Sequence, residues 1–151
     1  AAVRARRDPD FAIIARTDAR AVHGLEEAIA RAAAYAKAGA DLVFLEGLQS
    51  LGEVRTAVNA VPAPLLYNRS ASGKVPRLTA SELRELGVKI AIYPTHALYL
   101  VAKVVGDLYA ALRDEGHPDN IMPKAMDFDE FNDLLGLSGL RSLETEIESL
   151  K

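Results

Sequence analysis

The sequence contains no cysteine among its 151 residues. Disulfides, thiolate metal sites and a cysteine nucleophile are therefore excluded within these residues. No hydrophobic run approaches the roughly 20 residues that a membrane-spanning helix requires, and the first ten residues, AAVRARRDPD, contain no apolar signal core. We therefore expect a cytoplasmic protein with no membrane partner.

The sequence also has no excess of basic residues. Lys and Arg number 18 against 21 Asp and Glu, which gives a net charge of −3, and half of the residues are hydrophobic. An acidic globular protein has little attraction for a polyanion, so we do not expect nucleic acid as a partner. The length is that of one ordinary domain.

A strand followed by a helix is predicted four times in the first 116 residues. Each predicted strand is a short apolar run bounded by turn residues, and the apolar residues after it change to helical spacing. Strands that alternate with helices form parallel sheets covered by helices, so the fold class is α/β. The four predicted strands are residues 11–15, 41–47, 64–68 and 88–94.

Helix starts and stops are marked in several places. Glu53 stands three residues after Ser50, and Glu82 stands three residues after Thr79, which predicts two capping boxes. A long helix is expected at about 95–115, and residues 117–151 are expected to form a separate helical appendage. The long helix is expected to bury a stripe made of Leu98, Val101, Ala102, Val105, Leu108 and Leu112.

Polar side chains follow each predicted strand at its C-terminal end. Arg16 and Asp18 follow the first strand, Glu46 ends the second, Asn68 ends the third, and His96 follows the fourth. Carboxyl ends of parallel strands meet at one edge, where ligands bind in α/β folds, so these side chains should lie together. Because side chains alternate along a strand, Arg16 and Asp18 should point to the same side.

The residue types indicate a receptor for a small, oxygen-rich anion. An Arg offers a two-pronged fork to a carboxylate or phosphate, an Asn donates to a second oxygen, and a Glu orients the Arg or exchanges a proton. For any one of these residues, a structural ion pair is the competing interpretation. The coincidence at four strand ends favours a site.

Four motifs carry a resemblance to a known family. IIARTDA, GLEEAIARAAAYAKAGADLVFLEG, PLLYN and IAIYP occur in this order. Over about residues 1–136 the chain resembles the isocitrate lyase and phosphoenolpyruvate mutase superfamily. The resemblance implies a (β/α)8 barrel that cleaves or forms C–C or P–C bonds in small 2-oxo or 2-hydroxy acids on bound magnesium.

The resemblance also assigns roles to the strand-end residues. It implies that Arg16 stabilises the enolate or phosphoryl-bearing group, that Glu46 and Asn68 shape the pocket around the carboxylates, and that Ser70 helps to bind the substrate carboxylate. Together with the strand-end argument, it gives two groups of candidates. Arg16 and Glu46 are predicted to be catalytic, whereas Asn68, Ser70, Asp18 and His96 are predicted to bind substrate.

Only half of the implied barrel is expected in these residues. The resemblance identifies residues 1–116 as strands five to eight and residues 117–151 as C-terminal helices that family members exchange between subunits. It places the magnesium ligands and the loop with the catalytic cysteine of the lyases in the earlier half. A half-barrel leaves sheet edges and an apolar face uncovered, so we expect a piece of a longer protein rather than two pairing halves.

Three functions follow as alternatives. The first is a magnesium-dependent lyase of homo-oligomeric state, dimer or tetramer, that acts through an enolate on a small dicarboxylic or tricarboxylic acid such as 2-methylisocitrate. The second is a phosphonomutase or an oxaloacetate decarboxylase on the same scaffold. The third is a non-catalytic half-barrel that serves as an assembly module. For the enzymes, the chain alone is expected to be inactive.

Overall fold

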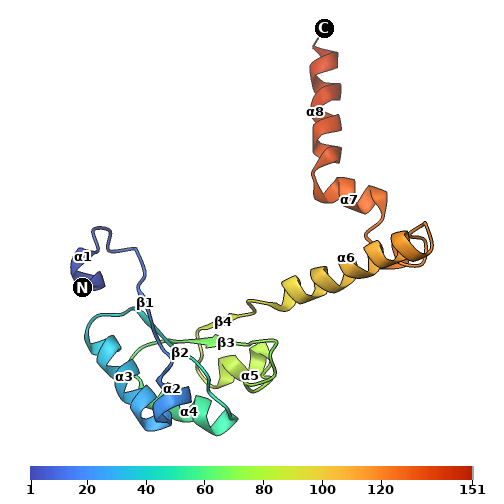
Figure 1. Cartoon of the computed structure of the whole chain (residues 1–151). Helices are drawn as coiled ribbons and strands as arrows, with labels where there is room; N and C mark the ends of the chain where they lie inside the picture. Colours follow the sequence, from blue (N-terminus) through green and yellow to red (C-terminus); the bar gives the residue numbers. More distant parts are fainter. Residues whose placement is uncertain (151) are drawn as a thin grey trace. The chain divides into compact units, whose positions relative to one another are not determined.

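A parallel sheet of four strands forms the centre of the first part of the chain (Figure 1). The computed structural model describes residues 1–150. The strands lie in chain order, and each of the three pairings is parallel, which confirms the predicted α/β class. The strands are β1 (Ile14–Thr17), β2 (Leu42–Leu45), β3 (Leu65–Asn68) and β4 (Ile90–Ile92).

The chain divides into two compact units, residues 1–99 and the residues from Leu100 on. In the first unit, α2 to α5 cover one face of the sheet (Figure 1). The division at residue 116 that the sequence suggests stays a prediction. The helices are α1 (Ala2–Ala5), α2 (Ala19–His23), α3 (Leu25–Lys37), α4 (Leu51–Ala60), α5 (Ala80–Glu85), α6 (His96–Asp114), the 3-10 turn η1 (Met122–Lys124), α7 (Phe128–Leu134) and α8 (Leu137–Ser149).

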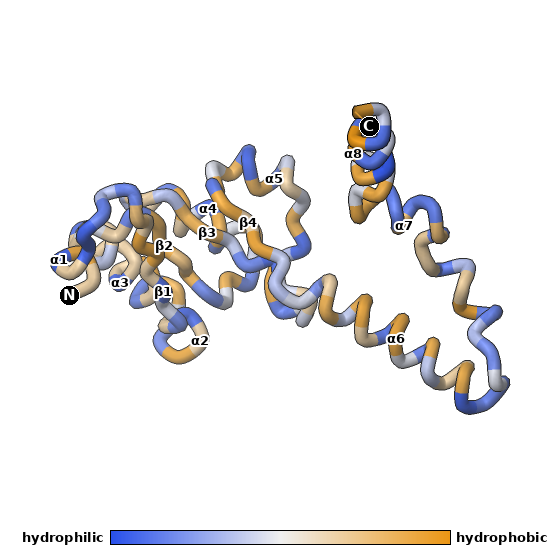
Figure 2. Tube along the Cα trace, turned by 90° about the horizontal axis from the view of Figure 1, so that it is seen from above, coloured by the Kyte–Doolittle hydropathy of each residue, from blue (hydrophilic) through white to orange (hydrophobic). Residues whose placement is uncertain are grey.

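The hydrophobic core lies between the sheet and these helices. Alternate residues of β2 and β3 point toward the helices, and the central strands are among the most hydrophobic parts of the trace (Figure 2). Alanines in α3 and α4 let both helices approach the sheet closely. The core includes Val43, Leu45, Leu65 and Tyr67 from the strands and Ala28, Ala32, Val54, Ala57 and Leu83 from the helices.

The first strand begins three residues later than the sequence predicts. Phe11, the first residue of the predicted strand, is 67% exposed, and the ladder to β2 begins with Ile14 opposite Leu42. Asp41 explains the late start because its carboxylate accepts the Ile13 amide at 2.8 Å and the Arg6 guanidinium at 2.7 Å. The Ile13 amide, followed by Arg6, lowers the pKa of Asp41.

One predicted capping box is complete, and the other is half formed. Thr79 accepts the Glu82 amide, and the Glu82 carboxylate accepts the Thr79 amide. Ser50 accepts the Glu53 amide at 3.2 Å. The Glu53 carboxylate instead accepts the Gln49 amide and both prongs of Arg20 on α2, at 2.6 and 2.9 Å. An ion pair between two helices has therefore replaced the second half of that box.

The stripe of α6 that the sequence predicts to be buried is not buried in this chain. None of its six residues is buried, and Leu98 and Val101 are about 60% exposed, at 61% and 58%. The spacing predicted the apolar face correctly, but nothing in residues 1–150 covers it.

None of the helices within residues 1–150 is both long and apolar enough to cross a membrane.

The core predicts a difference between two valine substitutions. Val54 on α4 is 0% exposed, and Val22 on α2 is 74% exposed. We expect Val54→Ala to lower the free energy of unfolding by about 2 kcal/mol, because it removes buried methyl groups and leaves a cavity. Val22→Ala should change it by less than about 0.5 kcal/mol. Urea unfolding of both variants measures the difference, and equal losses would contradict this core.

Candidate active site

The candidate site lies at the carboxyl ends of the strands, on the sheet face opposite the helices. Parallel pairing places Arg16 beside Phe44 and Phe44 beside Leu66. Two residues further along each strand, the same face carries Asp18, Glu46 and Asn68. The register therefore brings together residues that are about 28 and 22 positions apart in the chain.

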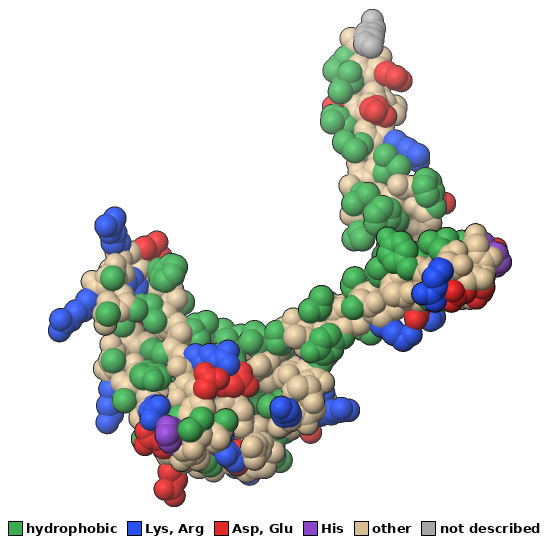
Figure 3. Space-filling model, in the orientation of Figure 1, with side chains coloured by type: hydrophobic (Ala, Val, Ile, Leu, Met, Phe, Trp, Pro, Cys, Tyr) green, Lys and Arg blue, Asp and Glu red, His purple; other side chains and the backbone are tan. Residues whose placement is uncertain are grey.

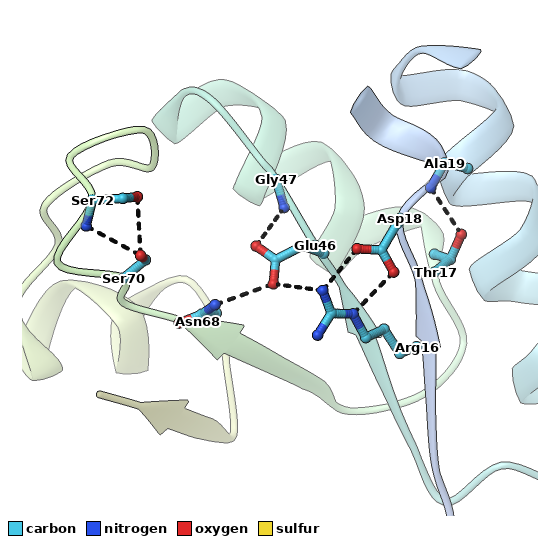
Figure 4. A network of polar contacts seen from close by, with 9 residues as sticks. All are labelled: Arg16, Thr17, Asp18, Ala19, Glu46, Gly47, Asn68, Ser70 and Ser72. Carbon is cyan, nitrogen blue, oxygen red and sulfur yellow. Dashed lines mark hydrogen bonds and ion pairs between the residues drawn. The ribbon is translucent and has the colours of Figure 1, made fainter. Parts of the chain in front are cut away.

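Arg16 and Asp18 form a two-pronged ion pair, which confirms that both point to one side (Figure 4). Arg16 Nε donates to Asp18 Oδ2 at 2.9 Å, and Nη2 donates to Oδ1 at 2.7 Å. The hydrogen bond from Arg16 lowers the pKa of Asp18, and the reciprocal bond raises the pKa of Arg16. Both side chains are about half exposed, so the pair is open to a ligand.

Thr17, between these two residues, faces the other way. Its side chain is buried among the helices, and its hydroxyl oxygen accepts the Ala19 amide at 3.3 Å (Figure 4). That amide belongs to the first turn of α2, where backbone N–H groups lack helical partners. Thr17 therefore anchors the start of α2 directly behind the Arg16–Asp18 pair.

Glu46 connects the ends of β1 and β3 (Figure 4). Its Oε1 accepts the Gly47 amide at 3.0 Å, and its Oε2 accepts Asn68 Nδ2 at 3.1 Å and lies 3.5 Å from Arg16 Nη2. Gly47 has a φ of 81°, a left-handed conformation that glycine adopts without strain. That turn directs the amide back at the carboxylate and fixes its orientation.

Phe44 is a site residue that the sequence reasoning did not identify. The Arg16 guanidinium carbon lies 4.9 Å from the centre of the Phe44 ring, within the range of a cation–π contact. The signal in the sequence was the alternation along β2, because Phe44 stands two residues before Glu46 and therefore shares its face. The Phe44 ring contacts the guanidinium, and the Asp18 carboxylate binds its Nε and Nη2.

Several hydrogen-bonding groups of the site remain unused within residues 1–150. A guanidinium carries five N–H donors, and Asp18 takes one from Nε and one from Nη2. Both donors on Nη1 have no partner in this part of the chain. Asn68 Oδ1 is buried and has no donor there either. The site can therefore bind an anion through Arg16 and a donor group through Asn68.

Ser70 and His96 do not join this network. The Ser70 hydroxyl donates to the Ser72 hydroxyl at 3.0 Å, and Ser70 lies in the loop after Asn68 (Figure 4). His96, at the start of α6, packs edge to face with Tyr93, with ring centres 5.4 Å apart. Its Nδ1 is buried without a partner among the described residues. Substrate binding by these two residues stays a prediction.

No group of three or more Asp, Glu, His or Cys side chains within residues 1–150 is arranged to hold a metal ion. The two carboxylates of the site, Asp18 and Glu46, are directed at Arg16, Asn68 and the Gly47 amide. This donor set suits an anion beside a guanidinium and does not fit a magnesium ion, which prefers several oxygen ligands.

The fold and the site define an α/β protein with a cluster of charged and polar side chains at one edge of a parallel sheet, and sequence comparison gives the family. Residues 1–113 match the family described as phosphoenolpyruvate phosphomutase, so the chain belongs to that family. The 2,3-dimethylmalate lyase of Eubacterium barkeri is 41% identical over 144 residues, 95% of this chain and 50% of the relative. The 2-methylisocitrate lyase of Aeropyrum pernix is 40% identical over 147 residues, 97% of this chain and 47% of the relative.

Solved structures give the same superfamily. The crystal structure of 2,3-dimethylmalate lyase, a member of the PEP mutase/isocitrate lyase superfamily, has a TM-score of 0.77 and 32% identity, over 91% of this chain and 48% of that one. Oxaloacetate acetylhydrolase with 3,3-difluorooxalacetate has a TM-score of 0.77 and 31% identity, over 92% and 46%. Phosphonopyruvate hydrolase with oxalate and Mg²⁺ has a TM-score of 0.75 and 29% identity, over 95% and 52%.

The chain thus spans about half the length of the relatives that it matches. The predicted superfamily is confirmed, and the 2,3-dimethylmalate lyase, the 2-methylisocitrate lyase and the oxaloacetate acetylhydrolase act on or bind small carboxylic acids, as their names state. Among lyases, hydrolases and mutases, the particular reaction is not distinguished by these similarities.

Tyr67, on the core side of β3, should make the free energy of unfolding fall at alkaline pH. Burial raises the pKa of Tyr67 from 10.0 to about 12. An unfolded Tyr67 ionises first, so its contribution is complete below pH 10 and is lost as pH rises toward 12. We expect the free energy of unfolding to fall by roughly 2 to 3 kcal/mol more than that of Tyr67→Phe over this range.

Urea unfolding at a series of pH values measures this difference. Tyr109→Phe is the matched control because Tyr109 is 67% exposed, and its alkaline curve should follow that of the original protein. Parallel curves for Tyr67→Phe and the original protein would contradict a buried, neutral Tyr67.

Proposed function

We propose that the whole protein is a lyase that cleaves a C–C bond in a small 2-hydroxy or 2-oxo dicarboxylic or tricarboxylic acid. The observation that carries this proposal is the Arg16 guanidinium, which is fixed by Asp18 and Phe44 and whose Nη1 donors have no partner within residues 1–150. Family membership and the lyases among the relatives support it.

Arg16 suits the charge that such a cleavage creates. When a base takes the proton of the 2-hydroxyl group, that carbon becomes a carbonyl and the C–C bond breaks. Its electron pair stays on the carbon next to a carboxyl group, and the negative charge spreads onto oxygen as an enolate. A guanidinium already held in place stabilises that charge with little reorganisation. Asp18 and the Phe44 ring prevent Arg16 from turning away, so its free donors keep one direction.

In this proposal Glu46 exchanges a proton and orients the substrate. The Gly47 amide and Asn68 Nδ2 each bind one of its oxygens, which fixes the plane of the carboxylate. A base must lie within hydrogen-bond reach of the proton that it moves, and a fixed carboxylate at the edge of the site meets that need. Asn68 Oδ1, buried without a donor within residues 1–150, is suited to accept a hydroxyl group of the substrate.

A magnesium ion is part of this proposal only for the whole protein. The phosphonopyruvate hydrolase structure contains Mg²⁺, whereas residues 1–150 of this chain offer no cluster of ligands for it. We propose that any magnesium ligands lie outside these residues. Magnesium would offset negative charge on the substrate, and the roles of Arg16 and Glu46 given above are independent of its position.

We further propose that the sheet is half of a (β/α)8 barrel. Away from the polar site at its end, the face opposite the helices exposes aliphatic side chains, with Ile14 45% and Ile90 38% exposed, and β1 and β4 are open edges. A closed barrel removes both edges and fills this face with side chains from the remaining strands. The superfamily relatives, about twice as long as this chain, support the idea.

The cytoplasmic location expected from the sequence stays a prediction.

A second candidate function is supported by the structural neighbours. Oxaloacetate acetylhydrolase and phosphonopyruvate hydrolase are as similar in fold as the lyase, and a phosphoenolpyruvate phosphomutase reaches a TM-score of 0.76. An oxaloacetate decarboxylase or a phosphonomutase would use the same free guanidinium. A non-catalytic assembly module would need none of these donors, and the absence of turnover on all substrates would favour it.

The lyase proposal predicts the effect of Arg16→Lys. Lysine keeps the charge but loses the fork to Asp18, so kcat on 2-methylisocitrate or 2,3-dimethylmalate should fall by roughly 100-fold. Arg31→Lys is the control, because Arg31 pairs only with Glu27 on the surface of α3. Steady-state kinetics of the whole protein with MgCl2 measures both, and equal turnover of Arg16→Lys and the original protein would exclude a catalytic Arg16.

A homo-oligomer is also proposed, because the helices after β4 have almost no core. Ala111 is the only buried residue among residues 100–150, and hydrophobic side chains gather along α7 and α8 (Figure 3). Large exposed apolar surfaces mark protein interfaces. On α8 and its C-cap residue Leu150, the exposed Leu140, Leu143, Ile147 and Leu150 recur at spacings of three and four residues, which places them on one face.

We expect the whole protein to elute as a dimer or tetramer in light-scattering chromatography. The double variant Leu143→Glu/Ile147→Glu should shift the mass toward one subunit, because it puts two charges into the apolar face. Glu144→Gln/Glu148→Gln changes two charges elsewhere on the same helix and should leave the mass unchanged. A single-subunit mass for the original protein would contradict the proposal.

A further inference from the structure

Tyr67 and Asn68 are neighbours on β3 that point to opposite faces of the sheet. Asn68 reaches the site, and Tyr67 enters the core, where only 4% of it is exposed. The Tyr67 hydroxyl donates to the Pro76 carbonyl oxygen at 2.9 Å. The end of β3 therefore contacts the site through Asn68 on one face and the far end of the following loop through Tyr67 on the other.

The loop between these points, residues 69–76, has few other ties to the fold. Val75 is buried in the core at the return end, and the Arg69 amide donates to the Ile92 carbonyl at the start. Between them, the Ser72 and Lys74 amides donate only to serine hydroxyls within the loop, at 3.2 and 3.5 Å. The Tyr67 bond thus closes a loop whose middle is held only by its own side chains.

The loop also carries positively charged side chains, whereas the site before it has only one, Arg16. Arg69, Lys74 and Arg77 make no ion pair within residues 1–150, whereas Arg16 is outnumbered by Asp18 and Glu46. A substrate with two or three carboxylates is repelled by those two acids unless cations face it. The 69–76 loop, which follows Asn68 and contains Ser70, carries two such cations, Arg69 and Lys74, and Arg77 follows its end.

We propose that Tyr67 is a positioning residue, whose hydroxyl closes the 69–76 loop and so holds Ser70 and the loop cations against the anionic end of a carboxylic acid substrate. The identity of the ligand in this inference rests on the proposed function. The closure of the loop by the Tyr67–Pro76 hydrogen bond, called the latch below, does not. The bond joins residues nine positions apart, so its loss leaves burial of Val75 as the tie at the return end of the loop and does not touch the Arg16 network. Tyr67 itself does not reach the substrate.

Trypsin tests the latch without any activity assay, because it cuts after Arg69, Lys74 and Arg77. In the whole protein, Tyr67→Phe removes only the hydroxyl, and we expect cleavage in this loop to accelerate by about fivefold to tenfold. Tyr35→Phe is the matched control: Tyr35 is half-buried on α3, and its hydroxyl has no hydrogen bond within residues 1–150. Unchanged loop cleavage in Tyr67→Phe would overturn the latch.

Steady-state kinetics then separates positioning from a purely structural role. Tyr67→Phe should raise KM for the carboxylic acid by about threefold to tenfold, with kcat within about twofold, and the rise should be larger at 0.02 M than at 0.2 M NaCl because salt screens the loop cations. A fall in kcat at constant KM, or equal KM values, would overturn the positioning role. If the original protein neither turns over substrate nor binds oxalate with Mg²⁺ by calorimetry, the proposed function fails, and so does the proposed contact between the loop and a carboxylic acid. The rate of trypsin cleavage still tests whether Tyr67 closes the loop.

Discussion

The site depends on the parallel hydrogen-bond register between β1, β2 and β3. That register sets Arg16 over Phe44 and Glu46 beside Asn68, and a shift of one residue would turn each of these side chains into the helical layer. The register is in turn fixed by the buried face, because Val43 and Leu65 must point toward the helices. Core packing on one side of the sheet therefore positions polar chemistry on the other.

Two surfaces of this chain are organised but uncovered. The sheet face around Ile14 and Ile90 and the apolar faces of α6 and α8 expose large aliphatic side chains, and burial of such surface is the main favourable term in folding and association. The proposed barrel completion and the proposed oligomer each account for one of them. Both follow from the same physical need, which is to remove apolar surface from water.

Local patterns predicted much of the fold. The four strands, the Thr79–Glu82 capping box and the α/β class were readable because each depends on residues close together in the sequence. The predicted start of the first strand at Phe11 was wrong, since the ladder begins at Ile14 and the Ile13 amide binds the carboxylate of Asp41, a residue 28 positions later. Likewise, Glu53 left its local cap to pair with Arg20.

The order of residue types along the chain determined the class of fold, the family and the side of the sheet on which Arg16 and Asp18 lie, because alternation along a strand and helical spacing are local properties. Only the tertiary structure decided which partners meet there. Phe44 under Arg16, Asn68 against Glu46 and the Tyr67 hydroxyl on Pro76 each join residues between strands or across a loop. Their contacts depend on distances in space, which packing and register set and sequence spacing does not.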